Sequence, residues 1–291
     1  MKIAIFGNKL KDSHLPIYQR ILSFFGQNNT ELIFSKSVKG SLDKKFGNAI
    51  KNYKSFDKQI DPDVDLLISI GGDGTFLSTV AYSLANNTPI AGINCGRLGF
   101  LAAISNDNLE QALQQLLNSE YKIENRSLLE VTSPIGLFNG NNYALNELTV
   151  HKLDNSSMIQ IETYINNEFL ANYWADGLII GTPTGSTAYS LSVGGPIIMP
   201  DLSGLIITPI APHNLTVRPI VVPDDAHIML KVSGRGTKYM ASFDHRSTPL
   251  EFSKIIEVRK APVSVPVVKL DGQSFYSTLR NKLMWGIDTR N

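Results

Sequence analysis

The turn Gly71-Gly72-Asp73-Gly74-Thr75 is the feature that most restricts how this chain can fold. It directly follows the apolar run Asp65–Ile70, which predicts a buried strand. The three glycines permit backbone angles and close approaches that a side chain would block. Backbone amides that point into such a turn, with a helix start behind it, bind phosphate well. The sequence therefore predicts a strand, a phosphate-binding turn and a helix, in that order.

Asp73 is the residue of this turn that phosphate binding does not explain. Its charge would repel a phosphate, so a carboxylate here suits a base acting on a hydroxyl group or a contact to a metal ion. The same side chain would also serve to close the turn or cap the following helix. The spacing matches neither a P-loop nor a dinucleotide fingerprint. The turn by itself therefore leaves the role of Asp73 open between chemistry and structure.

The first part of the chain alternates apolar strands with amphipathic helices. Strands are predicted at Lys2–Phe6, Asp65–Ile70 and Pro89–Ile93. Helical spacing predicts helices over Leu15–Phe25, Phe76–Leu84 and Leu109–Leu117, the last with Asn106 or Asp107 as its cap. The lysine-rich, weakly patterned stretch Gly40–Asp61 predicts a loop. Repeated strand–turn–helix units predict a parallel sheet covered by helices.

From about Tyr121 the pattern changes to short strands without long helical periodicity. Asn166-Asn167, directly after the strand predicted at Met158–Ile165, suits a hairpin turn. This profile is typical of a β-sandwich. The predicted strands are Tyr143–Val150, Met158–Ile165, Leu205–Ile210, Ile220–Val222, Ile228–Val232, Tyr239–Phe243, Ile255–Val258 and Val263–Val268.

The fold class that follows is an α/β N-terminal domain with a Rossmann-like three-layer arrangement plus an all-β sandwich C-terminal domain. Apolar residues at helical spacing from Phe275 to Met284 predict a last helix that returns to the first domain. We place the α/β domain at 1–122, the β-sandwich at 123–268 and the returning C-terminal segment at 269–291.

Two polar motifs lie in the strand-rich part. Asp176-Gly177 opens an apolar strand that runs into Thr182–Ser192, which is dense in Gly, Ser and Thr. Its hydroxyl groups suit phosphate and ribose oxygens, and Tyr189 suits stacking, although a plain polar turn is the alternative. The pair Asn146-Glu147 lies within a predicted strand, so its side chains point to opposite faces. Asn146 suits the recognition of a base or a ribose, and an exposed polar strand pair is the alternative.

The composition excludes several classes of partner. With 43% hydrophobic and 18% charged residues among 291, the chain has enough apolar residues for a sizeable core. Its net charge of +1 gives no electrostatic reason to expect nucleic acid or a membrane surface. The apolar start ends too early for a signal peptide, and no apolar run approaches the roughly 20 residues that span a bilayer.

The cysteine and histidine content restricts which cell compartment suits the protein and which metal sites it could form. Cys95 is the only cysteine, which excludes an internal disulfide and favours a reducing, cytoplasmic compartment. The five histidines show no metal-ligand spacing, so no resident metal site is predicted.

In combination these motifs resemble the NAD kinase family. The turn Gly71–Thr75, the pair Asn146-Glu147 and the run Asp176–Ser192 occur in the family's order and spacing. The glycine turn is shared with lipid kinases and phosphofructokinases, whereas the Thr182–Ser192 run is much more specific. The resemblance covers nearly the whole chain from about Asp65 onward, together with the opening strand. Further matches are Asn94–Leu101, Pro212–Leu215 with Arg218-Pro219, Ser242–Asp244 and Leu279–Gly286.

The resemblance implies that the chain transfers the γ-phosphoryl group of ATP to the 2′-hydroxyl of the adenosine ribose of NAD. It implies that Asp73 accepts the proton and that Mg²⁺, or another divalent cation, arrives with ATP. It implies a homo-oligomer, a dimer or a tetramer, and leaves Trp174, His245 and Arg246 without an assigned role. The implied phosphate-binding residues are Gly71, Gly72, Gly74 and Thr75, and the implied NAD contacts are Asp73, Gly74, Phe100, Asn146, Glu147, Asp176, Thr187, Ala188, Tyr189, Ser190, Leu191, Ser192 and Ala211.

Two other functions remain as alternatives. A lipid or sphingoid-type kinase shares the glycine turn, but the sequence shows no basic cluster or amphipathic membrane surface. A non-catalytic dinucleotide sensor is the second alternative, and a pure binder gains nothing from a carboxylate such as Asp73 beside phosphates.

Overall fold

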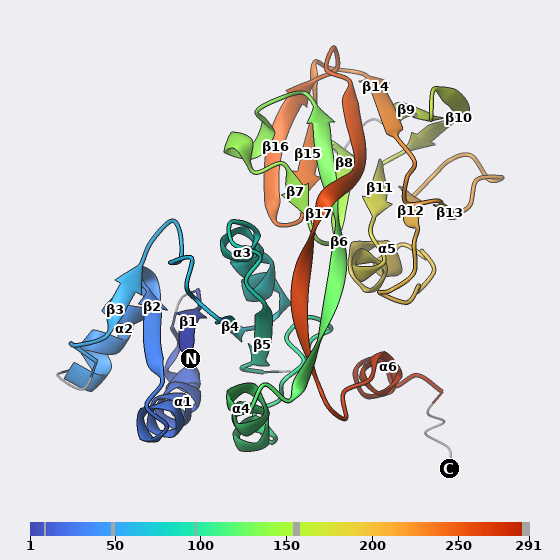
Figure 1. The fold of residues 1–291 in the computed structure, drawn as a ribbon. Helices are drawn as coiled ribbons and strands as arrows, with labels where there is room; N and C mark the ends of the chain where they lie inside the picture. The colour runs from blue at the N-terminus through green and yellow to red at the C-terminus, as the bar shows by residue number, and fades with distance from the viewer. Residues whose placement is uncertain (9, 48–49, 97, 154–157, 287–291) are drawn as a thin grey trace. The chain divides into compact units, whose positions relative to one another are not determined.

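The computed structural model describes residues 1–8, 10–47, 50–96, 98–153 and 158–286 (Figure 1). The chain divides into two compact units, each with its own hydrophobic core. Unit 1 comprises 1–125 together with 265–291, and unit 2 comprises 126–264. Strands β6 (Tyr121–Ser133) and β17 (Ile256–Leu270) contribute residues to both units. The predicted boundaries after residues 122 and 268 stay a proposal.

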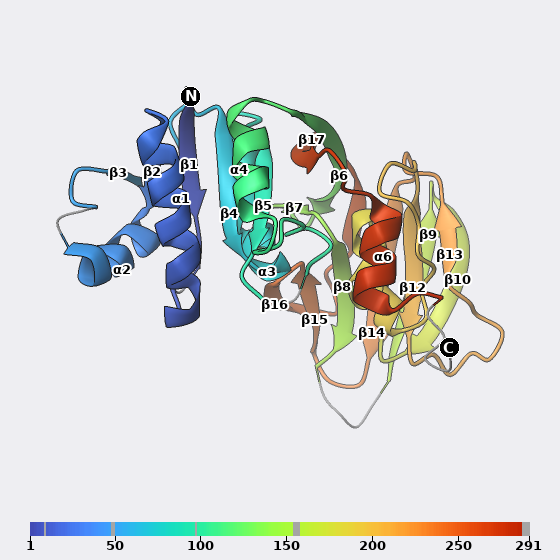
Figure 2. The same ribbon diagram turned by 90° about the horizontal axis from the view of Figure 1, so that it is seen from below.

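Unit 1 is built on a parallel sheet in the order β17-β5-β4-β1-β2-β3. Apolar side chains that alternate along these strands face a core shared with α1, α2 and α4, and α1 and α4 pack side by side (Figure 2). The opposite face of β4 meets α3, where the Thr79 hydroxyl donates to the Ser69 hydroxyl at 2.9 Å. Helices therefore cover both faces, which confirms the predicted three-layer α/β arrangement. The strands are β1 (Lys2–Phe6), β2 (Glu31–Ser35), β3 (Lys54–Phe56), β4 (Leu66–Gly71) and β5 (Ile90–Asn94), and the helices are α1 (Leu15–Gln27), α2 (Lys36–Phe46), α3 (Asp73–Leu84) and α4 (Leu109–Leu117).

Three local expectations for unit 1 were wrong. The stretch 40–61 is no loop, because it holds most of α2 and all of β3. Helix α2 buries only Val38 and Leu42, and so few apolar positions give a weak periodicity. Helix α3 begins at Asp73 rather than Phe76, since the glycine turn itself starts the helix. Helix α4 is preceded by Asn108 as its N-cap, and the Asn106 side chain instead accepts a hydrogen bond from Arg20.

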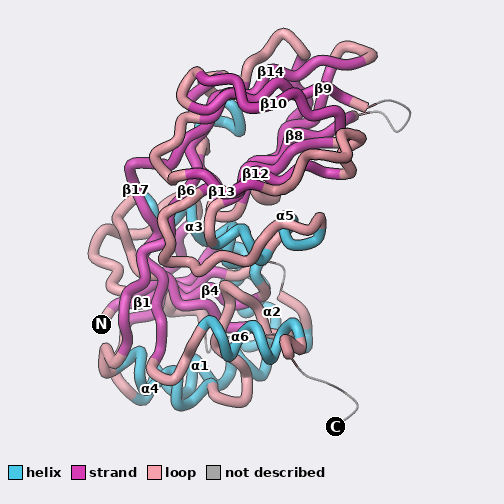
Figure 3. Tube along the Cα trace, turned by 90° about the vertical axis from the view of Figure 1, so that its right-hand side faces the viewer, coloured by secondary structure: helices cyan, strands magenta, loops and turns pink. Residues whose placement is uncertain are grey.

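Unit 2 is a β-sandwich, as predicted (Figure 3). One sheet is fully antiparallel, in the order β13-β12-β11-β8-β15-β16. The other contains β10-β9-β14-β17, and Leu178 from the first sheet shares one buried cluster with Ile161 and Leu230 from the second. The remaining strands are β8 (Glu147–Lys152), β9 (Ile159–Ile165), β10 (Glu168–Ala175), β11 (Gly177–Gly181), β12 (Leu205–Ile210), β13 (Ile220–Val222), β14 (Ile228–Gly234), β15 (Lys238–Phe243) and β16 (Arg246–Glu251).

The strand predictions for unit 2 needed three changes. The predicted strand 143–150 is interrupted and forms β7 (Tyr143–Ala144) and β8. The two strands predicted between 255 and 268 are one long strand, β17. Strands β6, β10 and β16 were not predicted. The hairpin turn between β9 and β10 is confirmed, because Asn166 and Asn167 both have positive φ, at 51° and 68°.

The last helix, α6 (Phe275–Leu283), packs back on unit 1 as predicted. Leu279 is 8% exposed, and the Phe275 ring lies 6.1 Å from the ring of Phe100. The Ser274 and Ser277 side chains form a reciprocal capping box that starts the helix. None of the helices in the described part of the chain is long and apolar enough to cross a membrane.

Candidate active site

The glycine turn opens onto a pocket of about 830 Å³ in unit 1. Gly71 ends strand β4 and Gly72 is the N-cap of α3. The Thr75 amide donates to the Gly72 carbonyl at 2.9 Å, and the amides of Asp73 and Gly74, which precede it in the first turn, suit an anion. A side chain at Gly71 would overlap Thr75, which explains why glycine stands there. The pocket is of a size that suits a nucleotide and carries two basic side chains, Lys11 and His14. Its other lining residues are Asn8, Ser13, Ser37, Gly71, Gly72, Thr75, Asn94, Cys95 and Gly96.

Neither basic residue of this pocket was predicted from the sequence, because the segment after β1 carries no recognisable motif. Burial, followed by the charge of Lys11, lowers the pKa of the His14 imidazole. His14 therefore stays neutral at physiological pH, and Lys11 supplies the positive charge of the pocket. Burial raises the pKa of the Cys95 thiol to about 11, which makes this cysteine a poor nucleophile.

The Asp73 carboxylate turns away from this pocket towards the backbone of residues 99–102. Its Oδ2 accepts a hydrogen bond from the Phe100 amide at 3.0 Å. Its Oδ1 accepts from the Leu101 amide at 3.1 Å and the Ala102 amide at 3.0 Å. Lys282 of α6 completes the set, with Nζ 3.3 Å from Oδ2. The carboxylate therefore has a structural task in this state, in addition to its position at the start of α3.

Gly99 is fitted to the Asp73 side chain. A Cβ atom at Gly99 would overlap the Asp73 carboxylate. The amide of Gly99 also donates to the Ala102 carbonyl at 3.2 Å, which closes the loop that supplies the three amides. The position of the Asp73 oxygens therefore depends on the absence of a side chain at residue 99.

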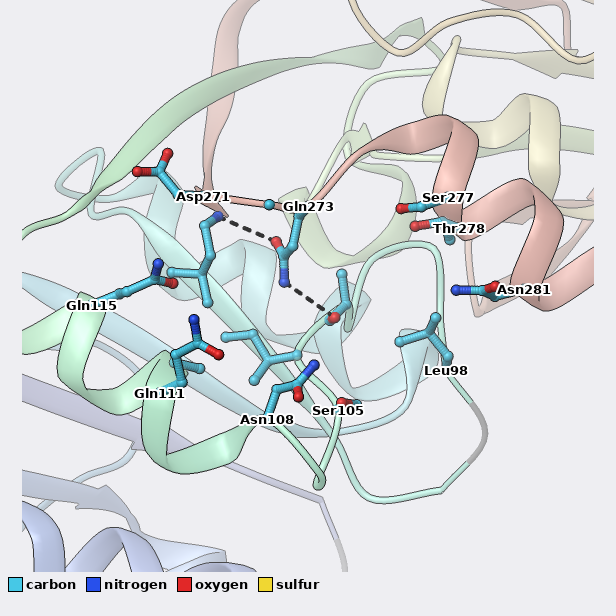
Figure 4. A pocket seen from close by; sticks show the side chains of 15 residues that line it. Leu98, Ser105, Asn108, Gln111, Gln115, Asp271, Gln273, Ser277, Thr278 and Asn281 are labelled. Atoms are coloured by element: carbon cyan, nitrogen blue, oxygen red, sulfur yellow. Dashed lines mark hydrogen bonds between the residues drawn. The ribbon is translucent and has the colours of Figure 1, made fainter.

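A second pocket, of about 530 Å³, lies on unit 1 between α4, α6 and residues 98–105 (Figure 4). Carboxamide and hydroxyl groups line it, among them Gln111, Gln115 and Asn281. Gln273 joins two of its walls, because its amide donates to the Ala103 carbonyl at 3.2 Å and its oxygen accepts from the Leu270 amide at 3.2 Å. This contact fastens the start of α6 to the segment that holds Asp73.

In unit 2, Asp244 breaks the predicted strand at the pair Asn146-Glu147. Its carboxylate accepts hydrogen bonds from the backbone amides of Leu145, Asn146 and Glu147, at 2.8–3.2 Å. These amides are thereby withdrawn from the sheet, and β8 starts only at Glu147. Burial raises the pKa of Asp244, and the three amides oppose this effect. The sequence had indicated 242–244 only through the family resemblance, without this role.

Glu147 lies in a pocket of about 510 Å³ in unit 2 together with Tyr189 and Asp244. Its Oε2 atom is buried and has no hydrogen-bond partner among the described residues. Burial, followed by the negative charge of Asp244, raises the pKa of Glu147 to about 8, and the backbone amide of Tyr189 opposes this shift. Glu147 is therefore mostly protonated at neutral pH and able to donate a hydrogen bond.

Replacing Glu147 with glutamine is expected to flatten the dependence of stability on pH. The folded state binds the Glu147 proton more tightly than the unfolded chain, in which the group titrates near its ordinary value of 4.5. The stabilising contribution is therefore complete below pH 4.5 and is lost as the pH rises through about 8. Melting temperatures across this range should show the variant gaining at least about 2 °C on the wild type towards alkaline pH. Parallel curves for the two proteins would contradict the raised pKa.

Residues 182–192 form a short 3₁₀ turn (Thr184–Thr187) and α5 (Tyr189–Ser192) that pack against residues 145–146. The Thr182 amide donates to the Asn146 carbonyl at 2.8 Å, and the Thr182 hydroxyl donates to the Leu145 carbonyl at 2.6 Å. A side chain at Gly185 would overlap the Asn146 carbonyl. The structure thus brings together two motifs that lie far apart in the sequence.

The predicted contact residues in this run differ in their exposure. Tyr189 and Ser192 are exposed, and Thr187, Ala188 and Leu191 are half-buried. Ser190 faces the interior, where its hydroxyl lies 2.8 Å from that of Thr208.

The other predicted positions in unit 2 are spread along its strand ends. Asp176, between β10 and β11, forms an ion pair with Lys152 at 2.6 Å. Ala211 is exposed and has a φ of +44°, a conformation that costs free energy for alanine and is frequent at functional sites. His245 lines the Glu147 pocket. Arg246 instead donates to the carbonyls of Asn141 and Tyr143, which gives it a structural role.

Within the described ranges, no group of three or more His, Cys, Asp and Glu side chains is placed to hold a metal ion.

In this chain a glycine turn starts a helix on a parallel sheet, a carboxylate occupies the first helical position, and a β-sandwich follows. This combination is typical of two-unit kinases that take their phosphoryl group from a nucleotide. The family model of the ATP-NAD kinase N-terminal domain matches residues 3–121, and that of the C-terminal domain matches residues 145–270. The NAD kinase of Flavobacterium johnsoniae is 46% identical over 295 aligned positions, covering 100% of both chains. The chain therefore belongs to the NAD kinase family.

Solved structures share this fold. The crystal structure of yeast NADH kinase complexed with NADH superposes with a TM-score of 0.84 at 22% identity, over 99% of this chain and 88% of that one. An NAD kinase from Archaeoglobus fulgidus in complex with ATP gives a TM-score of 0.71 at 24% identity, over 98% of each chain. At these identities the likeness shows the fold alone.

Proposed function

We propose that this member of the NAD kinase family phosphorylates NAD at the 2′-hydroxyl of its adenosine ribose, with the γ-phosphate of ATP as donor and Asp73 as proton acceptor. The observation that carries the proposal is the position of Asp73. Its carboxylate lies at the first residue of α3, directly behind the amides of the glycine turn. A base is thereby held next to a phosphate-binding turn, as phosphoryl transfer to an alcohol requires.

The pocket at the glycine turn is the proposed site of the triphosphate. The amides at the start of α3 and the Lys11 ammonium supply the positive potential that a triphosphate needs. Mg²⁺ or another divalent cation bound with ATP would neutralise part of the phosphate charge. As the bond from the ribose oxygen to the γ-phosphorus forms, the bond to the β-phosphate oxygen breaks, and the hydroxyl proton passes to Asp73. ADP leaves with the electron pair of the broken bond.

The NAD contacts proposed in unit 2 are those around the Glu147 pocket and the segment packed on it. Asn146 and Glu147 would bind the adenosine, and Asp176, the residues 187–192 and Ala211 would contact the rest of the dinucleotide. The protonated Glu147 supports this assignment, because a neutral carboxyl group donates to a ribose oxygen or to a ring nitrogen of adenine. In unit 1, the Phe100 ring would line the adenine-side pocket and Gly74 would lie beside the ligand.

Replacing Asn146 with alanine is expected to raise the Michaelis constant for NAD up to about tenfold, because one hydrogen bond to a neutral ligand group contributes about 0.5–1.5 kcal/mol. Asn146 is 9% exposed and directly precedes Glu147, which lines the pocket proposed for the adenosine. Steady-state kinetics with varied NAD at saturating ATP measure the effect. An unchanged Michaelis constant would mean that the Asn146 side chain does not bind NAD and that only the backbone of Asn146 contributes to the site.

We also propose a homo-oligomer, a dimer or a tetramer, assembled through unit 2. Strands β10 and β13 are edge strands, and exposed apolar side chains lie on or beside them: Trp174 at 44%, Leu215 at 85%, and Ile220 and Val221. We call these four residues the apolar edge surface. Its parts are joined, because the Asn214 side chain accepts a hydrogen bond from the Trp174 amide at 2.8 Å.

A charge placed on the apolar edge surface is expected to separate the subunits. Light scattering should give the wild type a mass of two or four times the 32.0 kDa of one chain, and Leu215→Glu a lower multiple. Leu153→Glu, at an exposed apolar residue outside this surface, is the matched control and should keep the wild-type mass. A wild-type mass of one chain would contradict the proposal.

A panel of acceptors tests the proposed function against its alternatives. The purified chain is incubated with ATP and Mg²⁺ and with NAD, sphingosine or diacylglycerol, and ADP is measured alongside each product. NADP should form with NAD, and no phosphorylated lipid should form. A phosphorylated lipid would favour the lipid-kinase alternative, and NAD binding without NADP would favour the sensor.

A cytoplasmic location is also part of the proposal, and the single cysteine supports it.

A further inference from the structure

The Asp73 carboxylate has no vacant acceptor position in this structure. A carboxylate has about four lone-pair positions, two on each oxygen. On Oδ1 they are taken by the amides of Leu101 and Ala102, and on Oδ2 by the amide of Phe100 and the ammonium of Lys282. A substrate hydroxyl therefore gains access to Asp73 only when one of these four donors leaves.

Lys282 is the donor that is able to leave. The three amides belong to one tight loop whose backbone is closed by the hydrogen bond from Gly99 to Ala102. Lys282 reaches Asp73 on a flexible side chain that is 32% exposed, from the last turn of α6. Rotation about its side-chain bonds frees Oδ2 without moving the backbone.

The residues around Lys282 hold its ammonium group close to Asp73. Its Nζ lies 4.5 Å from the centre of the Phe100 ring, a distance at which a cation is attracted to the ring face. Helix α6 itself is fixed by the buried Leu279 and by the contact from Gln273 to the Ala103 carbonyl, drawn in Figure 4. An ammonium displaced from Asp73 thus stays beside the site where phosphoryl transfer is proposed.

We propose that Lys282 is a further catalytic residue. In the resting state its ammonium binds Asp73 Oδ2, at the place where the substrate hydroxyl must bind. When the hydroxyl binds there, Lys282 moves to the transferred phosphoryl group. The inference rests on the function proposed above. In the resting state the ammonium neutralises Asp73, whose charge would otherwise repel an approaching triphosphate. In the transfer step the 2′-hydroxyl donates its proton to Oδ2, its oxygen bonds the γ-phosphorus, and the bond to the β-phosphate oxygen breaks. Lys282 keeps its protons and stabilises the negative charge on the equatorial oxygens.

The loss of Lys282 should leave the melting temperature nearly unchanged, because exposed ion pairs contribute little to folding. If Lys282 competes with the substrate hydroxyl for Oδ2, its removal opens this acceptor position, and NAD binding without ATP should be equal or tighter. Turnover should nevertheless fall, because the positive charge that stabilises the transferred phosphoryl group is gone. A purely structural ion pair would not give this combination.

The experiment compares Lys282→Met, which keeps the length and removes the charge, with Lys282→Arg, which keeps the charge. Arg280→Met is the matched control, because it removes a positive charge from the last turn of the same helix at an exposed position. For each protein we would measure the melting temperature, the affinity for NAD in the absence of ATP by calorimetry, and turnover at saturating ATP and NAD.

Lys282→Met should lower turnover at least about tenfold, and its NAD affinity should stay equal or rise. Lys282→Arg should recover most of that loss, and Arg280→Met should stay within about twofold of the wild type. The inference is overturned if Lys282→Met turns over within about threefold of the wild type, or if it loses turnover and NAD affinity together. A wild type that forms no NADP would instead refute the proposed function, so the two failures are distinguishable.

Discussion

Asp73→Asn is expected to lower turnover about 10²–10⁴-fold, the usual contribution of a positioned base. The substitution keeps the size of the side chain and removes its charge and basicity. It also replaces one oxygen with an NH₂ group, which must face either the Phe100 amide or the amides of Leu101 and Ala102. The variant should therefore also melt lower, by several degrees, since each lost hydrogen bond to a charged group contributes about 1.5–3 kcal/mol.

Separating the two effects requires paired measurements on one preparation. NAD affinity and circular dichroism at a temperature well below the melting transition report whether the site is formed. Turnover at saturating substrates is then measured at the same temperature. A folded variant that binds NAD and keeps more than about a tenth of wild-type turnover would remove Asp73 from the chemistry and leave it only its structural task.

Gly99→Ala is expected to lower turnover about 10²-fold with every catalytic group still present, because a displacement of about 1 Å is enough for such a loss. The added methyl group would overlap the Asp73 carboxylate, which must move or rotate. Gly99 has no positive φ, so the backbone accepts alanine and the effect is confined to this contact.

The matched control for Gly99→Ala is Gly26→Ala in α1, where a Cβ atom meets nothing within 4 Å. This control should be at least as stable as the wild type, since alanine favours helix over glycine, and should turn over normally. If Gly99→Ala is as active as the control, the position of the Asp73 oxygens is not decisive for turnover. A crystal structure of the variant would then show where the carboxylate has moved.

Much of the fold was predictable because long apolar runs determine it locally. The strands at 2–6 and 205–210 and the helix at 109–117 were predicted with the bounds observed. Helix α2 was not, because it buries only two apolar residues and its lysines suggested a loop. The break before β8 was not predicted either, because it is caused by Asp244, which lies about a hundred residues further along the chain.

The candidate site was predictable in its glycine turn and not in the groups that surround it. Asp73 was identified from its position in the turn, but its four partners come from residues 100–102 and from Lys282, 209 residues away. Sequence patterns describe neighbours along a chain, whereas the amides of residues 100–102 come from a loop 27 to 29 residues further on, and the Lys282 contact depends on the return of α6 to unit 1. The same reason explains why the raised pKa of Glu147, which depends on burial and on Asp244, had no signal in the sequence.

The central claim is transfer of the γ-phosphoryl group of ATP to the 2′-position of NAD at Asp73. It is tested most directly with ATP that carries a radiolabel in its γ-phosphate, incubated with NAD, Mg²⁺ and either the wild type or Asp73→Asn. The wild type should place the label in NADP, with the phosphate at the adenosine 2′-oxygen by NMR, and Asp73→Asn should do so at least about 10²-fold more slowly. Label that appears only as free phosphate, or equally fast labelling of NADP by the two proteins, would contradict the account.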